Sequence, residues 1–390
     1  MADVVRSARE VQHSGIREIV NLVIGRPDAD VVRLEIGEPG FSTPEHIVAA
    51  GCEAAANARY APSAGHAWLR EALSQRLARV HGLDVDPQDV VVGQGAVQAC
   101  AVTFAALLEP GTEVLVPDPA WPNYEMLVRM YGATPVRYPL RADAGFVPDP
   151  DEVAGLVTDR TAVIVLNSPG NPTGAVIPRD VVRGLVDLAV QRDLVLLSDE
   201  VYDELIFEGE PANALAFDRE HVVGVYSFSK TYAMTGWRVG YAVAPRWLSP
   251  TIAKLQEPML SSIADASAAG AMAALEGPQD EVGAMRDAYR VRRDLVVDLL
   301  QDAGMSVTSP RGAFYLMLPL SPEVDGRRAA LHLVDHGVST APGTSFGDVA
   351  ADHLRLSLAS EEPDLREGVK RVLTWYERTD GGRNLTVEGS

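Results

Sequence analysis

Short apolar runs of strand length alternate with longer helical stretches through the middle of this chain, and this alternation restricts the fold more than any other feature. The apolar runs cover residues 90–92, 113–116, 162–166, 194–197 and 222–226. The helical stretches between them cover residues 97–108, 124–131 and 179–192. The runs are almost continuously apolar, which is typical of strands buried on both faces. The sequence therefore predicts an α/β fold whose main part is a three-layer α-β-α domain with a mainly parallel sheet.

Polar or aromatic residues follow five of these strands at the point where each strand ends. In a parallel sheet the ligand lies beyond the carboxyl ends of the strands, so these residues are predicted to share one edge of the sheet. They are Gly93-Gln94-Gly95-Ala96 after the first strand, Asp118 and Trp121 after the second, residues 167–173 (including Asn171) after the third, Asp199 and Tyr202 after the fourth, and Lys230 after the fifth.

The two ends of the chain differ from its middle, because strands and helices there do not alternate regularly. Further helices are predicted at 14–25, 44–58, 69–81, 267–274, 286–303, 327–336 and 364–376. Further strands are predicted at 31–36, 237–243, 313–318, 338–341 and 353–358. We expect a large domain at residues 41–280, a smaller α+β domain built from residues 1–40 and 281–380, and a flexible tail at 381–390.

The composition limits the partners and the compartment. A formal net charge of −20 argues against nucleic acid or an anionic membrane, because both select clustered Lys and Arg. Cys52 and Cys100 lie outside any CxxC or Cys/His cluster, so neither a disulfide framework nor a structural zinc site is expected. The eight histidines show no HxH or HExxH spacing, which gives no support to a catalytic metal. Without an apolar signal region or membrane span, the sequence predicts a cytoplasmic protein.

Lys230 lies in a turn, Ser227-Phe228-Ser229-Lys230, between two strand-like apolar runs. A lysine amine enclosed in such a turn becomes nucleophilic when its pKa falls, as Schiff-base chemistry requires. Ser227, Ser229 and Arg238 are suitable partners for a phosphate group. A loop lysine with an unrelated arginine nearby explains this stretch equally well when it is considered alone.

Three more candidates each have a purely structural alternative. Asp199 follows an apolar strand, where it could pair with a cationic ring nitrogen or cap a helix. Trp121 could stack on such a ring or belong to the core, and Asn171 could contact a ligand or shape a turn among prolines. Residues 93–99 form a glycine turn into a helix N-terminus, which binds an anion or serves only as a turn. These residues do not match a dinucleotide-binding fingerprint.

Arg355 lies in the middle of the predicted strand at 353–358, with leucines on both sides. An unpaired buried charge is costly, so this guanidinium needs a partner. A planar carboxylate is the natural bidentate match, and it could come from a ligand or from an internal Asp or Glu. The spacing favours neither source.

Several motifs, taken in order, resemble the fold type I, pyridoxal-phosphate-dependent class I aminotransferases of the bacterial aspartate aminotransferase branch. They span nearly the whole chain and read IGEPGFSTPEHI (36–47), RYAPSAGHAWLREAL (59–73), PDPAWPNYEM, NSPGNPTG, SDEVYDELIF, SFSKTYAMTGWRVGY, GAFYLML, APGTSFG and HLRLSLASEE (353–362). The resemblance implies a transaminase that uses pyridoxal 5'-phosphate (PLP). Such an enzyme moves an amino group from an L-amino acid to a 2-oxo acid by a ping-pong mechanism.

The resemblance also implies roles for individual residues around the cofactor ring. Lys230 corresponds to the lysine that forms the Schiff base and then carries the proton between Cα and C4′. Asp199 corresponds to the partner of the pyridinium nitrogen. Tyr202 and Asn171 correspond to the donors to the 3-hydroxyl oxygen, and Trp121 to the aromatic residue that stacks on the ring.

Phosphate, substrate and subunit contacts are implied in the same way. The phosphate ligands would be Ser227, Ser229, Arg238 and the helix start Gly95-Ala96-Val97. Arg355 corresponds to the arginine that binds the substrate α-carboxylate, with a backbone contact from Gly37 and further substrate contacts from Trp121 and Asn171. Tyr60 corresponds to a tyrosine that reaches the phosphate of the other subunit, which implies a homodimer with shared active sites.

One departure from the family bears on the substrate. Aspartate-specific members of this branch resemble one another in a lysine that follows the glycine pair of the phosphate loop and reads the distal carboxylate. Here that position is Val97, which favours a neutral, aliphatic or aromatic substrate side chain. Two other functions remain open: a carbon–sulfur β-lyase on the same scaffold, and a non-catalytic PLP-binding regulatory protein. No appended DNA-binding segment or basic patch supports the second of these.

Overall fold

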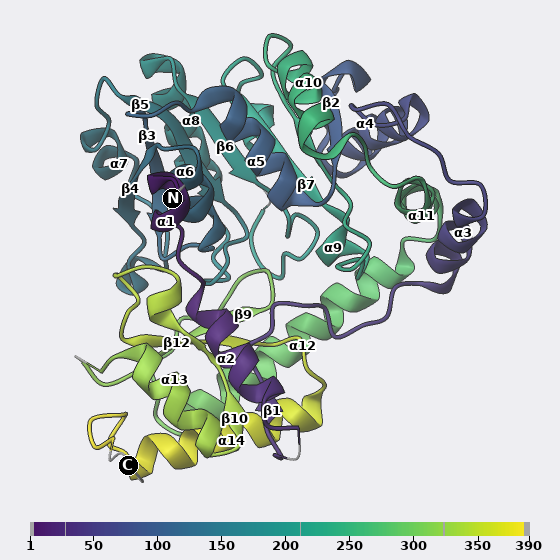
Figure 1. Cartoon of the computed structure of the whole chain (residues 1–390). Coiled ribbons are helices and arrows are strands. Elements are labelled where there is room, and N and C mark those ends of the chain that lie inside the picture. Colours follow the sequence, from purple (N-terminus) through teal and green to yellow (C-terminus); the bar gives the residue numbers. More distant parts are fainter. Residues whose placement is uncertain (1–3, 28, 211, 323, 386–390) are drawn as a thin grey trace.

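The computed structural model describes residues 4–27, 29–210, 212–322 and 324–385 of this 390-residue chain. Its larger part is built around a seven-stranded sheet. Its smaller part contains the strands that come from the N-terminal and C-terminal regions of the chain (Figure 1). The large sheet consists, in spatial order, of β2 (Val90–Gly93), β8 (Gly240–Val243), β7 (Val222–Ser227), β6 (Val195–Asp199), β5 (Thr161–Asn167), β3 (Glu113–Asp118) and β4 (Thr134–Pro139). Strand β8 is antiparallel to both neighbours and the remaining pairs are parallel, so the predicted mainly parallel sheet is confirmed.

Helices cover both faces of this sheet because alternate strand residues point to opposite sides. On β5, Ile164 and Leu166 pack into one hydrophobic cluster, while Val163 and Val165 pack into another. The first cluster includes residues of α4 (Ala67–His81), α7 (Pro150–Gly155), α8 (Arg179–Arg192) and α11 (Asp265–Glu276). The second includes residues of α5 (Ala96–Leu107), α6 (Asn123–Met130) and α10 (Ser249–Leu260). Burial on both faces explains the continuous apolar runs, and the three-layer prediction is confirmed.

The smaller part is α+β and draws on both ends of the chain, as predicted. Ile19 and Leu34 share one core with Leu316, Leu354 and Trp375. Its strands are β9 (Tyr315–Pro319), β11 (Ala341–Pro342) and β12 (His353–Ser357) in an antiparallel sheet, with β1 (Val32–Arg33) paired to β10 (Val338–Ser339). Its helices are α2 (Gly15–Ile24), α12 (Asp280–Asp302), α13 (Gly326–Asp335) and α14 (Glu362–Arg378). We propose that the domain boundary follows this division, with residues 41–280 as the large domain and residues 1–40 and 281–380 as the small domain.

Several predicted elements differ from those observed. The strand expected at 31–36 is limited to Val32–Arg33, and the one expected at 237–243 begins only at Gly240. Arg238 precedes it in a turn with a left-handed backbone, φ 55°. The edge strand β4 was not predicted. It contains two prolines, which argue against a central strand but are tolerated in an edge strand. The sequence pattern also missed α1 (Arg6–Glu10), α7, α10 and the short α9 (Phe228–Thr231).

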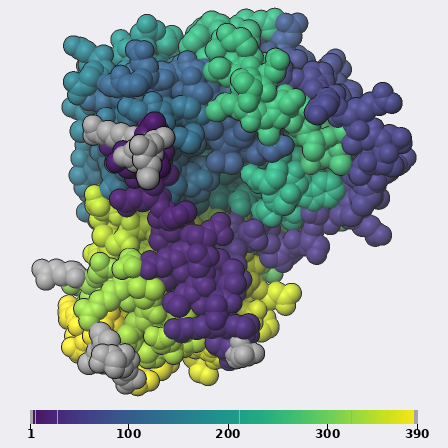
Figure 2. All heavy atoms as spheres, viewed as in Figure 1, coloured from purple at the N-terminus to yellow at the C-terminus, as the bar shows by residue number. Residues whose placement is uncertain are grey.

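The N-terminal segment crosses from the large domain to the small one. Helix α1 packs against α6, and α2 packs against α13 (Figures 1 and 2). At the other end, Leu385 is buried in the small-domain core, and residues 386–390 of the expected tail lie outside the described residues. None of the described helices is both long and apolar enough to cross a membrane. The path of the N-terminal segment matters because it forms one wall of the cleft between the domains.

Candidate active site

A cleft of about 650 Å³ lies beyond the carboxyl ends of β5, β6 and β7, where α2 and the small domain face it. The structure brings twelve of the predicted site residues to its wall: Gly37, Ala96, Val97, Trp121, Asn171, Asp199, Tyr202, Ser227, Ser229, Lys230, Arg238 and Arg355. Asp118 ends β3 but turns away, because its carboxylate accepts the backbone N–H groups of Asp348 and Val349. Asp118 therefore lies at the carboxyl end of its strand, as predicted, but it does not line the cleft.

Lys230 projects into the cleft from α9, directly after β7. Its Nζ donates a hydrogen bond to the carbonyl oxygen of Gly37 at 2.5 Å. The pKa of this amine is lowered to about 8, mainly by burial; Arg355 and Arg238 act in the same direction, and Glu38 opposes them. A lysine whose pKa approaches neutrality holds a larger fraction of unprotonated, nucleophilic amine.

Asp199 ends β6 with a carboxyl group that is almost completely buried. The hydroxyl group of Tyr124 donates a hydrogen bond to Oδ2, and the backbone N–H of Val201 donates one to Oδ1 at 3.2 Å. Burial raises the pKa of Asp199 to about 6, although both hydrogen bonds act to lower it. Since the described residues supply hydrogen bonds but no cation, a cationic group in the cleft is the natural partner of this carboxylate.

Arg355 is also buried, at 2% exposure, and points into the cleft from β12. Nη1 donates to Oδ1 of Asn171 at 3.0 Å, and Nη2 donates to the backbone oxygen of Glu35 at 2.5 Å. Nε has no hydrogen-bond partner within the described part of the chain. Burial lowers the pKa of this guanidinium. No described Asp or Glu forms an ion pair with it, so the internal partner that the sequence left open is not found, and an anionic ligand fits.

The part of the cleft beside Arg238 and the start of α5, called the phosphate pole below, is suited to a phosphate group. Gly95 precedes α5 with φ +81°, and a Cβ atom added there would lie 2.3 Å from Nη2 of Arg238. This close approach brings the guanidinium to the start of the helix, where unpaired N–H groups favour an anion. Arg238 itself donates to carbonyl oxygens of Thr235 and Gln94. Ser227 and Ser229 complete this set of donors on the cleft wall.

Tyr60, predicted to contact the phosphate of the other subunit, lies away from the cleft of its own chain. Its side chain is 91% exposed, yet its loop is fixed, because the neighbouring backbone N–H groups donate to Asp265 and Ser262. It cannot contribute to the cleft of its own chain from this position.

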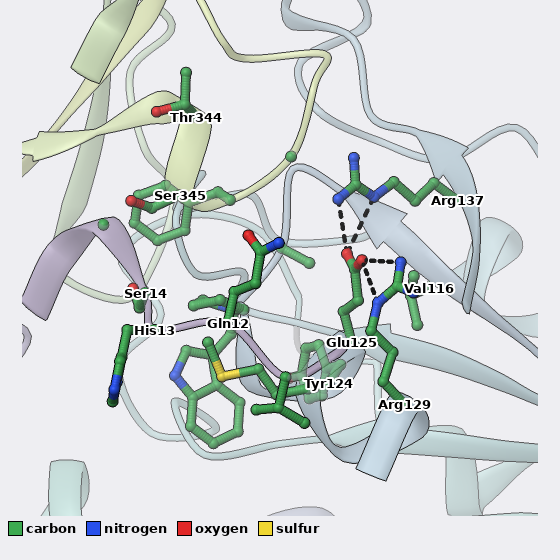
Figure 3. A pocket seen from close by; sticks show the side chains of 18 of the residues that line it. Gln12, His13, Ser14, Val116, Tyr124, Glu125, Arg129, Arg137, Thr344 and Ser345 are labelled. Carbon is green, nitrogen blue, oxygen red and sulfur yellow. Dashed lines mark hydrogen bonds and ion pairs between the residues drawn. The ribbon is translucent and has the colours of Figure 1, made fainter. Parts of the chain in front are cut away.

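A second hollow, of about 530 Å³, adjoins the cleft between the N-terminal segment and α6 (Figure 3). Arg129 and Arg137 reach it, but Glu125 accepts hydrogen bonds from both of them. Arg137 is further paired with Asp348 at 2.6 Å. Because Arg129 and Arg137 are already paired with carboxylates and Lys230 is not among the residues that line it, this hollow is a poor candidate for the reaction site.

Sequence reasoning missed several residues of the cleft. Tyr124 donates a hydrogen bond to Asp199. Tyr315 and Tyr202 share a hydrogen bond in which either can be the donor, with 2.9 Å between their hydroxyl oxygens. No local signal identifies either tyrosine, because the partners lie 75 and 113 residues away in the chain. Asn167, from the predicted set at residues 167–173, also lines the cleft. The other lining residues that the sequence did not indicate are Ile16, Arg17, Glu38, Asn123, Val201, Thr235 and Gly236.

A lysine amine, a buried carboxylate without a cation and an anion-binding helix start, arranged along one edge of a parallel sheet, define a PLP-dependent enzyme of fold type I. The family model for aminotransferase class I and II matches residues 29–372. The chain belongs to this family. PLP is accordingly its cofactor, and the donor set of the cleft fits that molecule at both its ring nitrogen and its phosphate.

Individual relatives agree with this assignment. The chain is 41% identical over 356 residues to the aspartate/prephenate aminotransferase of Thermus thermophilus, covering 90% of this chain and 92% of that one. It is 39% identical to an arginine–pyruvate transaminase of Pseudomonas aeruginosa, covering 88% and 89%. The solved structure of Thermus thermophilus aspartate aminotransferase with maleate superposes with a TM-score of 0.92 at 38% identity, covering 96% and 100%.

The predicted activity is confirmed at the level of the reaction. The protein is an aminotransferase, and the relatives are named as transaminases rather than as β-lyases or regulatory proteins. Neither of the two alternatives left open by the sequence is therefore favoured.

Proposed function

We propose that this aminotransferase accepts an L-amino acid with a neutral side chain and passes its amino group to a 2-oxo acid in a ping-pong reaction. The observation that carries the proposal is that Lys230, Asp199 and Arg355 line one cleft. Within the described residues, the buried carboxylate and the buried guanidinium have no partner of opposite charge. The apolar side chain of Val97 in the same wall supports the neutral substrate.

Each of these three side chains would have a separate task. Bound PLP supplies an electron sink that makes the α-hydrogen of an amino acid acidic. Ionised Asp199 would hold the proton on the ring nitrogen, and the resulting pair would lower the pKa of Asp199 from its value of about 6. Lys230, once its amine is free and unprotonated, would accept the proton from Cα of the substrate and deliver it to C4′ of the cofactor. Arg355 would bind the α-carboxylate and so fix which Cα bond is broken.

The remaining contacts would orient the cofactor. Tyr202 and Asn171 would donate to the 3-oxygen of the ring, and Trp121 would stack on its face. The Asn171 side chain already accepts a hydrogen bond from Arg355 through Oδ1, which leaves its amide N–H groups for the cofactor. Gly95, Ala96, Val97, Ser227, Ser229 and Arg238 would enclose the phosphate, and Gly37 would add a backbone contact to the substrate.

A substrate with an acidic side chain is the second candidate, because Arg17 also lines the cleft. This residue lies in the first turn of α2, and its guanidinium has no hydrogen bond or ion pair to any described side chain. An arginine at the mouth of the cleft could bind a distal carboxylate. The relatives named for aspartate make this candidate worth testing alongside the neutral one.

A substrate panel decides between the two candidates. We expect kcat/KM for amino donors with aliphatic or aromatic side chains to exceed that for aspartate by about tenfold or more, a difference of roughly 1.4 kcal/mol. Val97→Lys should raise kcat/KM for aspartate, and Arg17→Ala should leave transfer from the neutral donors unchanged. Preference of the wild type for aspartate, together with its loss in Arg17→Ala, would instead establish the acidic substrate.

We propose further that two copies of the chain form a homodimer with shared active sites. Tyr60 is exposed on a fixed loop, and Trp68 and Met259 are also large, partly exposed apolar residues. In the proposed dimer, the second copy of the chain would cover these exposed apolar side chains. We expect sedimentation analysis to give twice the chain mass, and Tyr60→Phe to weaken PLP binding within an intact dimer. A fully active monomer would contradict this arrangement.

We propose a cytoplasmic location because both cysteines have free thiols. Cys52 is exposed and Cys100 is buried, and neither forms a disulfide. Free thiols persist in a reducing compartment.

A further inference from the structure

Tyr315, the first residue of β9, contacts both Arg355, the proposed substrate-binding residue, and Tyr202, a proposed cofactor-binding residue. Its side chain is 1% exposed and belongs to the wall of the cleft. In the β9–β12 register, Arg355 is opposite Met317, so Tyr315 lies diagonally next to Arg355 on the same face of the sheet. The guanidinium carbon of Arg355 lies 4.3 Å from the centre of the Tyr315 ring, which is a stacked cation–π contact.

The hydroxyl group of Tyr315 has a second set of neighbours. It lies 2.9 Å from the hydroxyl oxygen of Tyr202, the proposed donor to the cofactor 3-oxygen. A Cβ atom added to Gly37 would lie 2.6 Å from the Tyr315 hydroxyl, so glycine at this position leaves the room that the hydroxyl occupies. The carbonyl of the same Gly37 accepts the hydrogen bond from Lys230.

We propose that Tyr315 is a positioning residue that holds Arg355 with its ring and polarises Tyr202 with its hydroxyl group. The inference rests on the proposed roles of Tyr202 and Arg355. A phenol has one proton to donate but can accept hydrogen bonds as well. If Tyr315 donates to the oxygen of Tyr202, the proton of Tyr202 stays available for the cofactor, and its donor strength increases because hydrogen bonds in a chain polarise one another.

The electrostatic surroundings support this direction of the hydrogen bond. The charged groups that face the two phenols are Arg355 from β12, Glu38 from the N-terminal segment and Asp199 from β6. Burial raises the pKa of both phenols, and the pKa of Tyr202 is well above its ordinary value. Arg355 acts to lower the pKa of both phenols, and it lies directly on the ring of Tyr315, 4.3 Å from its centre. A cation stacked on a phenol ring favours loss of its hydroxyl proton, so the contact with Arg355 favours Tyr315 as the donor and Tyr202 as the acceptor.

Replacement of Tyr315 by phenylalanine isolates the hydroxyl group, because the ring beneath Arg355 is kept. A hydrogen bond donated to the cofactor 3-oxygen stabilises negative charge there and favours the deprotonated form of the bound cofactor. Weakening that bond in Tyr315→Phe should therefore raise the pH midpoint of the visible absorbance change of bound PLP, by on the order of half a pH unit. KM for the amino donor should stay the same.

Replacement by leucine serves as the matched variant that removes the ring as well. Tyr315→Leu should show the same spectral shift and, in addition, a several-fold to tenfold higher KM, because the guanidinium of Arg355 loses its stacking partner. In a Tyr202→Phe background, Tyr315→Phe should produce no further shift of the midpoint, because the hydroxyl would act only through Tyr202.

Three outcomes contradict the proposal. An unchanged midpoint in Tyr315→Phe would leave the hydroxyl with a packing role only, and a lower midpoint would show that Tyr202 donates to Tyr315. A further shift in the Tyr202→Phe background would show that the hydroxyl acts by another route. Failure of the proposed roles is distinguishable, because Tyr202→Phe alone would then leave the midpoint unchanged and Arg355→Ala would leave KM for the amino donor unchanged.

Discussion

Replacing Lys230 by alanine is expected to lower kcat by about 10⁴-fold or more, because both covalent attachment of the cofactor and general-base catalysis depend on this amine. The visible absorbance of bound PLP should be lost, while PLP binding through the phosphate pole is retained. Steady-state transfer assays and absorbance spectra of the purified variant measure these effects.

Stability provides an independent readout for the same variant. The folded-state pKa of Lys230, about 8, lies below the ordinary lysine value of 10.5, so the cofactor-free fold disfavours the charged amine. Its destabilising effect grows as pH falls from about 10.5 to 8 and stays at its full value below that. The cofactor-free Lys230→Ala protein should therefore unfold at pH 7 at a temperature no lower than that of the cofactor-free wild type.

Lys254 offers a matched control on the surface of α10. The chain contains three lysines, Lys230, Lys254 and Lys370, so the residue attached to PLP after borohydride reduction is readily located by mass spectrometry. The Lys254→Ala variant should keep activity, absorbance and attachment. Attachment of the cofactor to Lys254 or Lys370, or substantial turnover by Lys230→Ala, would exclude Lys230 from the role proposed for it.

The sequence predicted the sheet and its active edge because these depend on local, repeated signals. Buried strands such as β5 need apolar residues on both faces, and Asp199 and Lys230 stand at strand ends where the chain must turn. The edge strand β4 has no such signal, because only one side of it pairs and prolines are tolerated there.

The contacts between distant residues could not be predicted from spacing. Tyr124 reads as part of an ordinary amphipathic helix, and only the parallel arrangement of β3, β5 and β6 brings its hydroxyl to Asp199. Arg238 reads as part of a strand, yet its left-handed backbone brings the guanidinium to Gly95. Tertiary packing determined the geometry of these residues.

The Asp199→Asn variant is expected to lose about 10²- to 10⁴-fold in kcat/KM and to bind PLP more weakly. Removing one partner of a buried charge pair costs roughly 3–5 kcal/mol, and each 1.4 kcal/mol corresponds to a factor of ten. Asparagine keeps the size of the side chain and can still accept the hydrogen bond from Tyr124. Titration with PLP and steady-state kinetics test the loss.

The cofactor-free protein should show the opposite effect on stability. The folded-state pKa of Asp199, about 6, lies above the ordinary value of 3.8, so wild-type stability falls as pH rises from about 4 to 6. Above pH 6 the buried carboxylate destabilises the fold by roughly 3 kcal/mol, since one pKa unit corresponds to about 1.4 kcal/mol. Asp199→Asn should therefore be more stable than the wild type at pH 7 without PLP, and this advantage should shrink or reverse when PLP is added.

The neighbouring residue Glu200 is the matched control, because it tests whether loss of any buried carboxyl group has the same effect. It is also a buried carboxyl group, and burial raises its pKa to about 8 although a hydrogen bond from Ser198 opposes the shift. It lines a separate small cavity with His81 and Asn213. Because Glu200 is largely protonated at pH 7, Glu200→Gln should keep kcat/KM and PLP affinity within about twofold. Equal losses in the two variants would mean that any buried carboxyl group at the end of β6 supports the fold. The ring nitrogen would then need a partner other than Asp199.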